Sequence, residues 1–452
     1  MRIIQITPGT GDNFYCENCL RDNELVKGLR ALGHDALMVP LYLPPTTDGQ
    51  ATEATAPIFF GGINVYLQQK LRLFRKTPRW LDSLLDARWL LKLVSRRVGM
   101  TDATDLAETT ISMLRGEDGR QRKELERLTG WLLANSRADV VCLSNSLLMG
   151  MARRIKEALR APVICMLQDE DEFLDELPEP HRGRAWETLR QRAADIDAFV
   201  APSACFGAVM ARRLDISADR IDVVYNGISP GMFEPAELPT DPPVIGFLSR
   251  MCHGKGLDIL VKAFVILKQS DRLKGARLRV AGGKLMADEP YVSGIQMDLA
   301  ERGLASDVEF LPNLQQEDRA AFLRSLSVLS VPARKGTSAG RCVLEALATG
   351  VPVIQPRSGA FPELLEATGG GLLCDPENAE DLAGAIEKLL LDPAHAAELG
   401  RRGRDTVLKE FALKQAVQRM LHVCTKVVNE TGTAADHSGT PSDESSPGRR
   451  QC

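Results

Sequence analysis

The strongest constraint on the fold is an alternation that runs along most of the 452 residues, in which short β-branched runs are followed by helical stretches. Such alternation is typical of parallel strands joined by crossover helices, so we expect an α/β protein. A proline-rich segment with few large apolar side chains, 234–243, divides the alternation into two series. Each series is long enough to bury its own core. The sequence therefore predicts two Rossmann-like, doubly wound domains that face a cleft.

The strands can be placed by their apolar runs and the turn signals that bound them. The strands expected in the first series are 2–7, 35–40, 140–143, 163–167, 198–201 and 222–225. Those expected in the second series are 244–248, 277–281, 308–311, 328–331 and 352–355. The clearest helices between them are 21–32, 257–269, 343–349 and 379–391.

These elements define the expected domains. The first domain should occupy 1–235 and the second 236–410, with a helix at 411–430 that returns to the first domain. Residues 57–135 contain no convincing strand and are mostly helical in pattern, which indicates an insertion in the first domain. The last residues, 431–452, are rich in Ser, Thr, Gly and Pro and predict a disordered tail.

Charge and hydropathy exclude several classes of protein. The chain has 56 Lys and Arg against 60 Asp and Glu, a net charge of -4, so it lacks the basic field of a dedicated nucleic-acid binder. It also has no run of about 18 uncharged apolar residues, and its first six residues indicate a strand rather than a signal peptide. We therefore expect a cytoplasmic protein without a nucleic-acid partner.

Two loops of the second domain carry candidate anion-binding groups. Arg250 and Lys255 leave the carboxyl end of an expected strand on a glycine-containing loop, where open α/β sheets bind ligands. This pair suits a diphosphate, because arginine can donate two hydrogen bonds to phosphate oxygens while lysine acts as a point charge. A later segment, 330–350, passes from a strand through a Gly-rich loop into a helix. Its N–H groups at 340–343 can hold a phosphate, and the Glu345 carboxylate can accept bonds from a ribose diol.

The loop after the first strand is less specific. Gly9 and Gly11 could expose N–H groups to an anion at a helix start, but Phe14 stands at the third glycine position of a dinucleotide fingerprint. A tight turn and a substrate-facing loop both remain open interpretations.

The second domain resembles a known family. Residues 244–391 contain S-R-x-x-x-G-K-G, A-G-G, E-F-L-P, V-L-E-A-L-A-T-G-V-P-V-I and G-G-G-L-L-C-D-P, and this run is similar to the C-terminal half of the retaining glycosyltransferases of family four, or group 1. The first half is similar through G-H-D at 33–35, P-S at 202–203 and V-V-Y-N-G-I at 223–228. The resemblance covers roughly 1–56 and 136–430.

The resemblance implies a GT-B fold and a metal-independent, hexosyltransferase-like reaction without a cofactor. The donor would be a nucleotide-diphosphate sugar, and the acceptor a glycan, a lipid or a precursor of a cell-envelope polysaccharide. By position, Arg250 and Lys255 would bind the diphosphate and Glu345 the ribose. The other residues assigned to the nucleotide sugar are Gly11 at the sugar, Leu314 near the base, and Gly340 with the backbone of Arg341 and Cys342 at the phosphate.

The chain departs from the family at two positions near the sugar. Thr337 stands eight residues before Glu345, where the family usually has another glutamate, and Gln168 stands where it has a histidine. We keep Gln168 as a candidate catalytic residue and Thr337 as a sugar-binding one, and expect a changed donor. Two alternatives stay open, namely a catalytically weak or inactive nucleotide-binding scaffold and a sugar-nucleotide epimerase.

Three further patterns have a structural and a functional interpretation. Asp169–Glu172 contains a D-x-D sequence, but two cations already suit the diphosphate, so we prefer an acidic turn to a metal site. Cys16 and Cys19 form a lone C-x-x-C, which is a weak signal for zinc binding; redox-sensitive thiols at a helix start are one interpretation, and ordinary packing is the one we prefer. Residues 70–98 form a basic amphipathic pattern, with nine basic and two acidic residues between 70 and 97. Peripheral contact with the inner membrane face is one interpretation, and a packed helix with a basic rim is the one we prefer.

Overall fold

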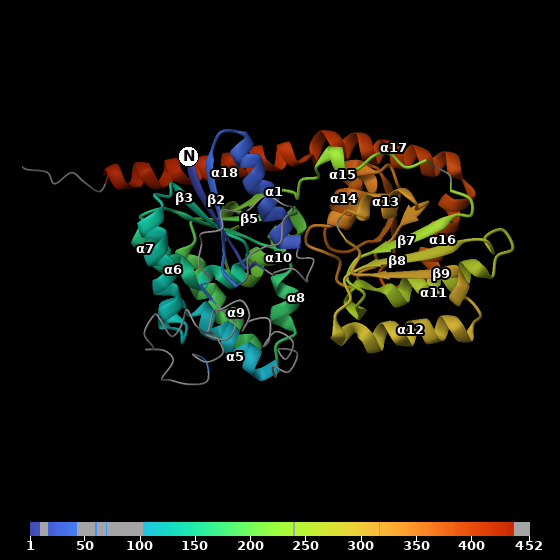
Figure 1. The fold of residues 1–452 in the computed structure, drawn as a ribbon, viewed down its shortest axis with the longest axis horizontal. Helices are drawn as coiled ribbons and strands as arrows, with labels where there is room; N and C mark the ends of the chain where they lie inside the picture. Colours follow the sequence, from blue (N-terminus) through green and yellow to red (C-terminus); the bar gives the residue numbers. More distant parts are fainter. Residues whose placement is uncertain are drawn as a thin grey trace, which may run out of the picture.

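The computed structural model describes residues 1–9, 17–42, 59–60, 69, 103–237, 240–315 and 317–437. Within these residues the chain forms two six-stranded parallel sheets, each with helices packed against it, which lie side by side as two lobes (Figure 1). The predicted α/β fold with two Rossmann-like domains is confirmed.

The first sheet has the strand order β2-β1-β3-β4-β5-β6. Its strands are β1 (Arg2–Thr7), β2 (Asp35–Pro40), β3 (Val140–Leu143), β4 (Val163–Met166), β5 (Ala198–Ala201) and β6 (Ile221–Val223). The chain passes from β1 to β2 on one side and then to β3 on the other. The order therefore reverses between β1 and β3, which is where such sheets bind ligands.

Alternating side chains of β1 explain why helices cover both faces of this sheet. Ile4 and Ile6 point into one buried cluster, whereas Ile3 points into the other. The covering helices are α1 (Glu17–Ala31), α7 (Ala152–Leu159), α8 (Glu170–Asp175), α9 (His181–Arg192) and α10 (Ala204–Leu214).

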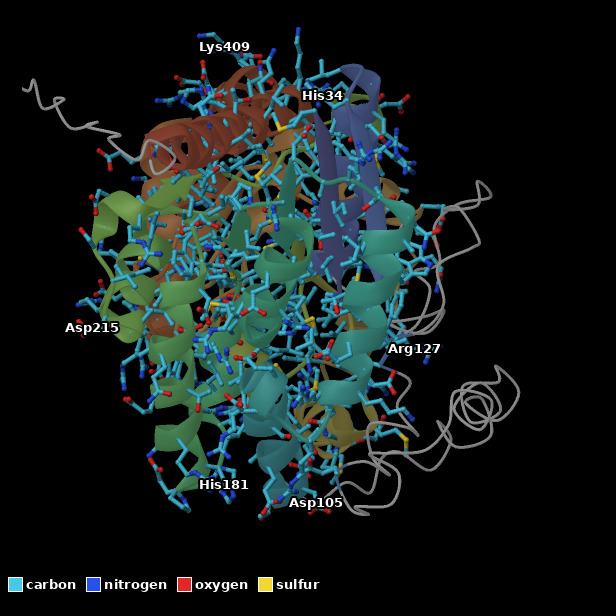
Figure 2. The ribbon with its side chains drawn as sticks, turned by 90° about the vertical axis from the view of Figure 1, so that its left-hand side faces the viewer. His34, Asp105, Arg127, His181, Asp215 and Lys409 are labelled. Carbon is cyan, nitrogen blue, oxygen red and sulfur yellow. The ribbon has the colours of Figure 1, made fainter. Side chains whose placement is uncertain are left out.

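The described part of the expected insertion is helical. It contains α5 (Ala103–Leu114), a short 3-10 helix (Gly116–Asp118) and α6 (Arg122–Asn135), and no strand lies among its described residues. Helix α5 packs against α9, and Figure 2 shows Asp105 and His181 together at the end of the domain opposite His34. Residues 70–98 lie outside the part of the chain that the structure describes.

The second sheet has the order β12-β11-β10-β7-β8-β9, which reverses between β7 and β10. Its strands are β7 (Val244–Leu248), β8 (Arg277–Gly282), β9 (Val308–Pro312), β10 (Val328–Leu329), β11 (Val353–Pro356) and β12 (Gly371–Cys374). Its helices are α11 (Leu257–Lys268), α12 (Glu289–Glu301), α13 (Arg319–Arg324), α14 (Arg341–Ala348), α15 (Phe361–Thr368), α16 (Ala379–Leu391) and α17 (Pro393–Glu410). The loops after β7 and β10 therefore leave the sheet side by side, and these loops carry the two predicted anion-binding segments.

A C-terminal helix, α18 (Leu413–His437), runs from the second domain across the first (Figure 1). It buries Val417, Met420 and Cys424 against the side chains of α1 and the first sheet. The predicted disordered tail from residue 431 is wrong for 431–437, because the helix continues. Each added residue of an established helix gains a backbone hydrogen bond, and the Thr431 hydroxyl donates to the Val427 carbonyl at 2.8 Å.

Among the helices that the structure describes, none combines the length and the hydropathy needed to cross a membrane.

If α18 holds the first domain together by packing, Met420→Ala should lower the free energy of unfolding by about 2 to 4 kcal/mol, because it leaves a cavity in a buried cluster. Urea unfolding followed by circular dichroism would measure the change. Gln418→Ala, on the exposed face of the same helix, is the matched control and should change it by less than about 0.5 kcal/mol. Equal losses in the two variants would show that α18 is not part of the core.

Candidate functional site

The candidate site lies where loops at the carboxyl ends of the two sheets meet. The backbone N–H of Ser338, which follows β10, donates to Asp169 Oδ1 after β4 at 3.0 Å. The Ser203 hydroxyl donates to the Ser338 carbonyl at 2.6 Å. At the start of α10, the N–H groups of Ala204 and Cys205 donate to the Glu363 carboxylate of α15 at 2.9 and 3.0 Å. The two domains therefore touch at the carboxyl ends of their sheets.

Arg250 extends from the loop after β7. Its Nε and Nη2 donate to the two carboxylate oxygens of Asp288 at 3.0 and 2.9 Å, and this bonding raises the pKa of Arg250. Asp288 is buried, whereas 43% of the arginine side chain remains exposed. Asp288 thus fixes one edge of a guanidinium that still reaches solvent.

Lys255 is held close to the loop after β10 by the glycine that follows it. Gly256 has φ +74°, and a Cβ there would lie 1.9 Å from the Pro332 carbonyl oxygen, so only glycine allows this approach. The Lys255 ammonium donates to both oxygens of Glu172, at 2.9 and 3.1 Å. Glu172 belongs to α8 of the first domain. Burial raises the pKa of Glu172, and the attraction of Lys255 opposes that rise.

Glu345 lies on the inner side of α14 with only 2% of its side chain exposed. Arg341 Nε donates to its Oε1 at 2.8 Å, and the Arg319 guanidinium of α13 donates to its Oε2. Burial alone would raise the pKa of Glu345, but the two guanidiniums outweigh burial and lower it. A carboxylate has about four acceptor positions, so an ionised Glu345 keeps capacity for a vicinal diol.

The start of α14 is shaped by two residues of the Gly-rich loop. Gly340 has φ +60° at the helix N-cap, and its N–H donates to the Thr337 hydroxyl at 2.9 Å. Thr337 therefore supports the loop rather than extending as a glutamate would. Cys342 is buried in the first turn of the helix.

The side chain of Arg341 points to a contact that sequence reasoning missed. Besides bonding Glu345, it donates through Nη1 to Glu24 of α1, in the other domain, at 3.0 Å. The spacing of Arg341 and Glu345 is the i, i+4 spacing of helical ion pairs, so that bond could have been found from sequence. Arg319 and Glu24 carry no such signal, because only the fold brings them to α14.

Gln168 lies two residues after the end of β4 and is buried. Its Oε1 accepts from Arg21 Nη1 at 2.8 Å, and Arg21 also donates to Asp22 and to the Ser144 carbonyl. The buried carboxylate of Glu170 accepts from the N–H groups of Ser146 and Gln168, both at 2.7 Å. Burial raises its pKa to about 7. Gln168 is therefore held by side chains of the first domain. The next residue, Asp169, accepts the hydrogen bond from Ser338 of the second domain.

The remaining candidate residues lie away from these charged groups or outside the residues that the structure describes. Leu314, after β9, packs against the second core. Gly11 and Cys16 lie outside the described residues, while Cys19 is buried. Across the described ranges, no three His, Cys, Asp or Glu side chains are arranged as a metal site. A pocket of about 220 Å³ spans the domain junction. It is lined by Leu20, Met232, Phe233, Glu317, Arg319, Ala320, Arg341 and Glu345.

Two family models divide this chain between them. The model for glycosyl transferases group 1 matches residues 231–406, and the model for the glycosyl transferase 4-like domain matches residues 22–227. The chain belongs to the group 1 glycosyltransferases. Both sheets lie within the matched regions except for β1, so the match covers the two faces of the candidate site.

Two curated relatives match parts of this group 1 chain. A D-inositol 3-phosphate glycosyltransferase from Saccharomonospora viridis is 29% identical over 261 residues, which are 54% of this chain and 59% of the relative. A GDP-mannose-dependent alpha-(1-6)-phosphatidylinositol monomannoside mannosyltransferase from Mycolicibacterium smegmatis is 32% identical over 177 residues, which are 38% of this chain and 44% of the relative. The chain thus spans about half the length of the curated relatives it matches.

Solved structures share the two-domain fold over nearly the whole chain. Sucrose-phosphate synthase from Thermosynechococcus elongatus has a TM-score of 0.70 at 18% identity, covering 95% of this chain and 99% of that one. Anabaena Alr3699/HepE, in complex with UDP, has a TM-score of 0.66 at 16% identity, and the match covers 94% of this chain and 100% of that one. The fold of this group 1 protein is therefore GT-B.

The pairing of Glu345 predicts a pH-dependent loss of stability. Arg319→Met should lower the free energy of unfolding by roughly 3 kcal/mol at pH 7, because a buried carboxylate loses one of two cations. The folded pKa of Glu345 lies below its unfolded value, so the stabilisation is present above the unfolded pKa and disappears as pH falls through the folded one.

Urea unfolding of wild type and Arg319→Met at pH 7 and pH 3.5 would show this. The difference in the free energy of unfolding between wild type and variant should be smaller at pH 3.5 than at pH 7. A difference that stays the same at both values would mean that Arg319 acts by packing and not by charge. Arg324→Met, an exposed arginine of the same helix, is the control and should change stability little at either pH.

Proposed function

We propose that the protein is a retaining glycosyltransferase that moves a hexosyl group from a nucleotide-diphosphate sugar to a hydroxyl group of a glycan or lipid acceptor. The observation that carries the proposal is the placement of Arg250, Lys255 and Glu345 on the two neighbouring segments that leave the second sheet at its switch point. Loops of the first domain contact these segments, so an acceptor bound to the first domain would meet the donor there.

Each group has a distinct role in the proposed donor site. Arg250 and Lys255 bind the diphosphate, and N–H groups at the start of α14, at Arg341 and Cys342, contribute to the same phosphates. Glu345 accepts hydrogen bonds from the ribose hydroxyls. The names of relatives support a nucleotide sugar as donor, since one is GDP-mannose-dependent and Alr3699/HepE has been solved with UDP-glucose.

In the proposed reaction, the bond between the anomeric carbon and the β-phosphate oxygen breaks while the acceptor oxygen bonds to the same face of that carbon. The acceptor proton passes to the departing diphosphate. Arg250 and Lys255 stabilise the charge that develops there, and for this reason we propose that no metal ion or cofactor is needed. The remaining contribution of the protein is orientation of donor and acceptor.

Gln168 and Thr337 would determine the sugar. Arg21 has only donors, so it bonds Gln168 through the amide oxygen and leaves the amide NH₂ group as a donor. Thr337 is shorter than glutamate and its hydroxyl already accepts from Gly340. At these two positions the site therefore offers the sugar an amide and a hydroxyl group in place of the family's histidine and glutamate.

The acceptor is the least constrained part of the proposal. One relative is named for a phosphatidylinositol monomannoside, which supports a lipid-linked acceptor or a cell-envelope precursor at the cytoplasmic side of a membrane. Residues 70–98, with their basic amphipathic pattern, are the segment we propose for peripheral contact with that surface.

A second candidate function is a nucleotide-binding scaffold with little or no catalysis. Thr337 and Gln168 favour it, because they replace the sugar-site glutamate and histidine usual in the family while the groups proposed for the nucleotide remain. The two candidates differ in turnover and not in nucleotide binding.

A panel of UDP-, GDP- and ADP-sugars tests the proposal, with nucleotide release and calorimetric binding both measured. We expect binding and release with at least one donor, and Lys255→Ala should weaken binding at least tenfold because it removes a phosphate cation. Lys262→Ala, an exposed lysine on α11, is the matched control and should not change it. Binding without release would favour the scaffold, and no binding at all would contradict both candidates.

Glu172→Gln should tighten nucleotide-diphosphate binding several-fold. The carboxylate competes with a phosphate for the Lys255 ammonium, and a neutral amide competes less strongly. Calorimetry with UDP and GDP would measure the effect. Weaker binding by the variant would show that Glu172 supports the cation site and does not compete for it.

A further inference from the structure

Arg341 joins the proposed ribose-binding carboxylate to the opposite domain. Its Nε donates to Glu345 Oε1 at 2.8 Å, while Nη1 and Nη2 donate to the two oxygens of Glu24 at 3.0 and 3.4 Å. Glu345 belongs to α14 of the second domain, whereas Glu24 belongs to α1 of the first. Only 3% of the arginine side chain and 11% of the Glu24 side chain are exposed, so water screens the group weakly.

The guanidinium transmits orientation because it is rigid. Its donors lie in one plane at fixed angles and it stays protonated, so the direction of its Nη groups determines the direction of its Nε. When Glu24 holds the Nη groups, Arg341 can present Nε to Glu345 in one geometry only. Opening the junction between the domains would remove that restraint.

The two oxygens of Glu345 therefore depend on different parts of the molecule. Oε2 accepts from Arg319, which lies in the same domain and stays in place whether or not the domains touch. Oε1 accepts from Arg341, whose other edge is held across the junction. One half of the carboxylate is positioned by its own domain and the other half through Glu24.

A second ion pair across the junction, between Lys255 and Glu172, has a different consequence. Glu172 bonds Lys255 at the ammonium that the proposed phosphate needs, so it competes with the ligand. Glu24 bonds Arg341 at the edge that Glu345 does not use, and so leaves the carboxylate available. The same change from glutamate to glutamine should therefore act differently at the two positions.

We propose that Arg341 and Glu24 are positioning residues that make recognition of the ribose hydroxyls depend on contact between the domains. When the domains meet, Glu24 orients Arg341, and Arg341 fixes the Glu345 carboxylate for the vicinal diol of the nucleoside. When they separate, Arg341 loses the restraint that Glu24 places on its Nη groups, Arg319 is left as the fixed partner of the carboxylate, and the hold on the ribose weakens, which favours release of the product nucleotide. This inference rests on the proposed nucleotide-sugar site.

The test compares the affinity for UDP and GDP with that for their 2′-deoxy forms, because the ratio isolates the ribose contact. Wild type should bind the tighter of the two ribonucleotides at least tenfold more tightly than its 2′-deoxy form. Glu24→Gln and Glu24→Ala should reduce this ratio to about threefold or less. Glu172→Gln, the matched control, should keep the wild-type ratio although its affinity for both forms changes. Circular dichroism would confirm that each variant is folded.

Three results would overturn the inference. An unchanged ratio in both folded Glu24 variants would show that Glu24 only docks the domains, and would leave the proposed function intact. An equal fall of the ratio in Glu172→Gln would show that any lost contact between the domains has this effect. A wild type that binds neither ribonucleotide, or binds one without discriminating its 2′-deoxy form, would contradict the proposed ribose site itself.

Discussion

All the candidate chemistry depends on the carboxyl ends of two parallel sheets being turned toward each other. Loops at these ends are released from the hydrogen-bonding pattern of the sheet, and the order of each sheet reverses there, so a gap opens between neighbouring loops. In the second domain this brings the loop of Arg250 and Lys255 beside the loop that leads into α14. In the first domain it places Gln168 and the acidic segment after β4 opposite them.

The charges of the site are balanced by carboxylates, and the source of each carboxylate matters. Arg250 is paired within its domain, by Asp288. Lys255 and Arg341 are paired across the junction, by Glu172 and Glu24. Buried charges are costly unless they are paired, so contact between the domains and the electrostatics of the site cannot be separated. A diphosphate that enters the site would take over part of this balance.

Much of the fold follows from local sequence. Strands such as β1 and β7 are β-branched runs bounded by turn residues, and their positions agree with prediction. Strand β12 was not predicted, because it is short and begins with the last of three glycines, a pattern typical of a loop. The helix α18 extends past residue 430, where composition indicated disorder. The prediction failed there because composition alone does not register the continuation of a packed helix.

The site was predicted less completely, for a physical reason. Sequence patterns pointed to Arg250, Lys255 and Glu345, because each lies in a motif whose spacing has chemical meaning. They did not point to Asp288, Glu172, Arg319 or Glu24, whose partners are 38, 83, 26 and 317 residues away along the chain. The pairing of those side chains follows from tertiary structure alone. Arg250, Lys255 and Glu345 were thus foreseen, and the oppositely charged side chains that pair with them were not.

A crystal structure with a bound nucleoside diphosphate tests the central claim most directly. The account predicts the diphosphate between Arg250 and Lys255, the ribose hydroxyls on Glu345, and Glu172 displaced from the lysine ammonium. A nucleotide bound elsewhere, or one bound while Lys255 keeps its bond to Glu172 and Glu345 touches no hydroxyl, would contradict it.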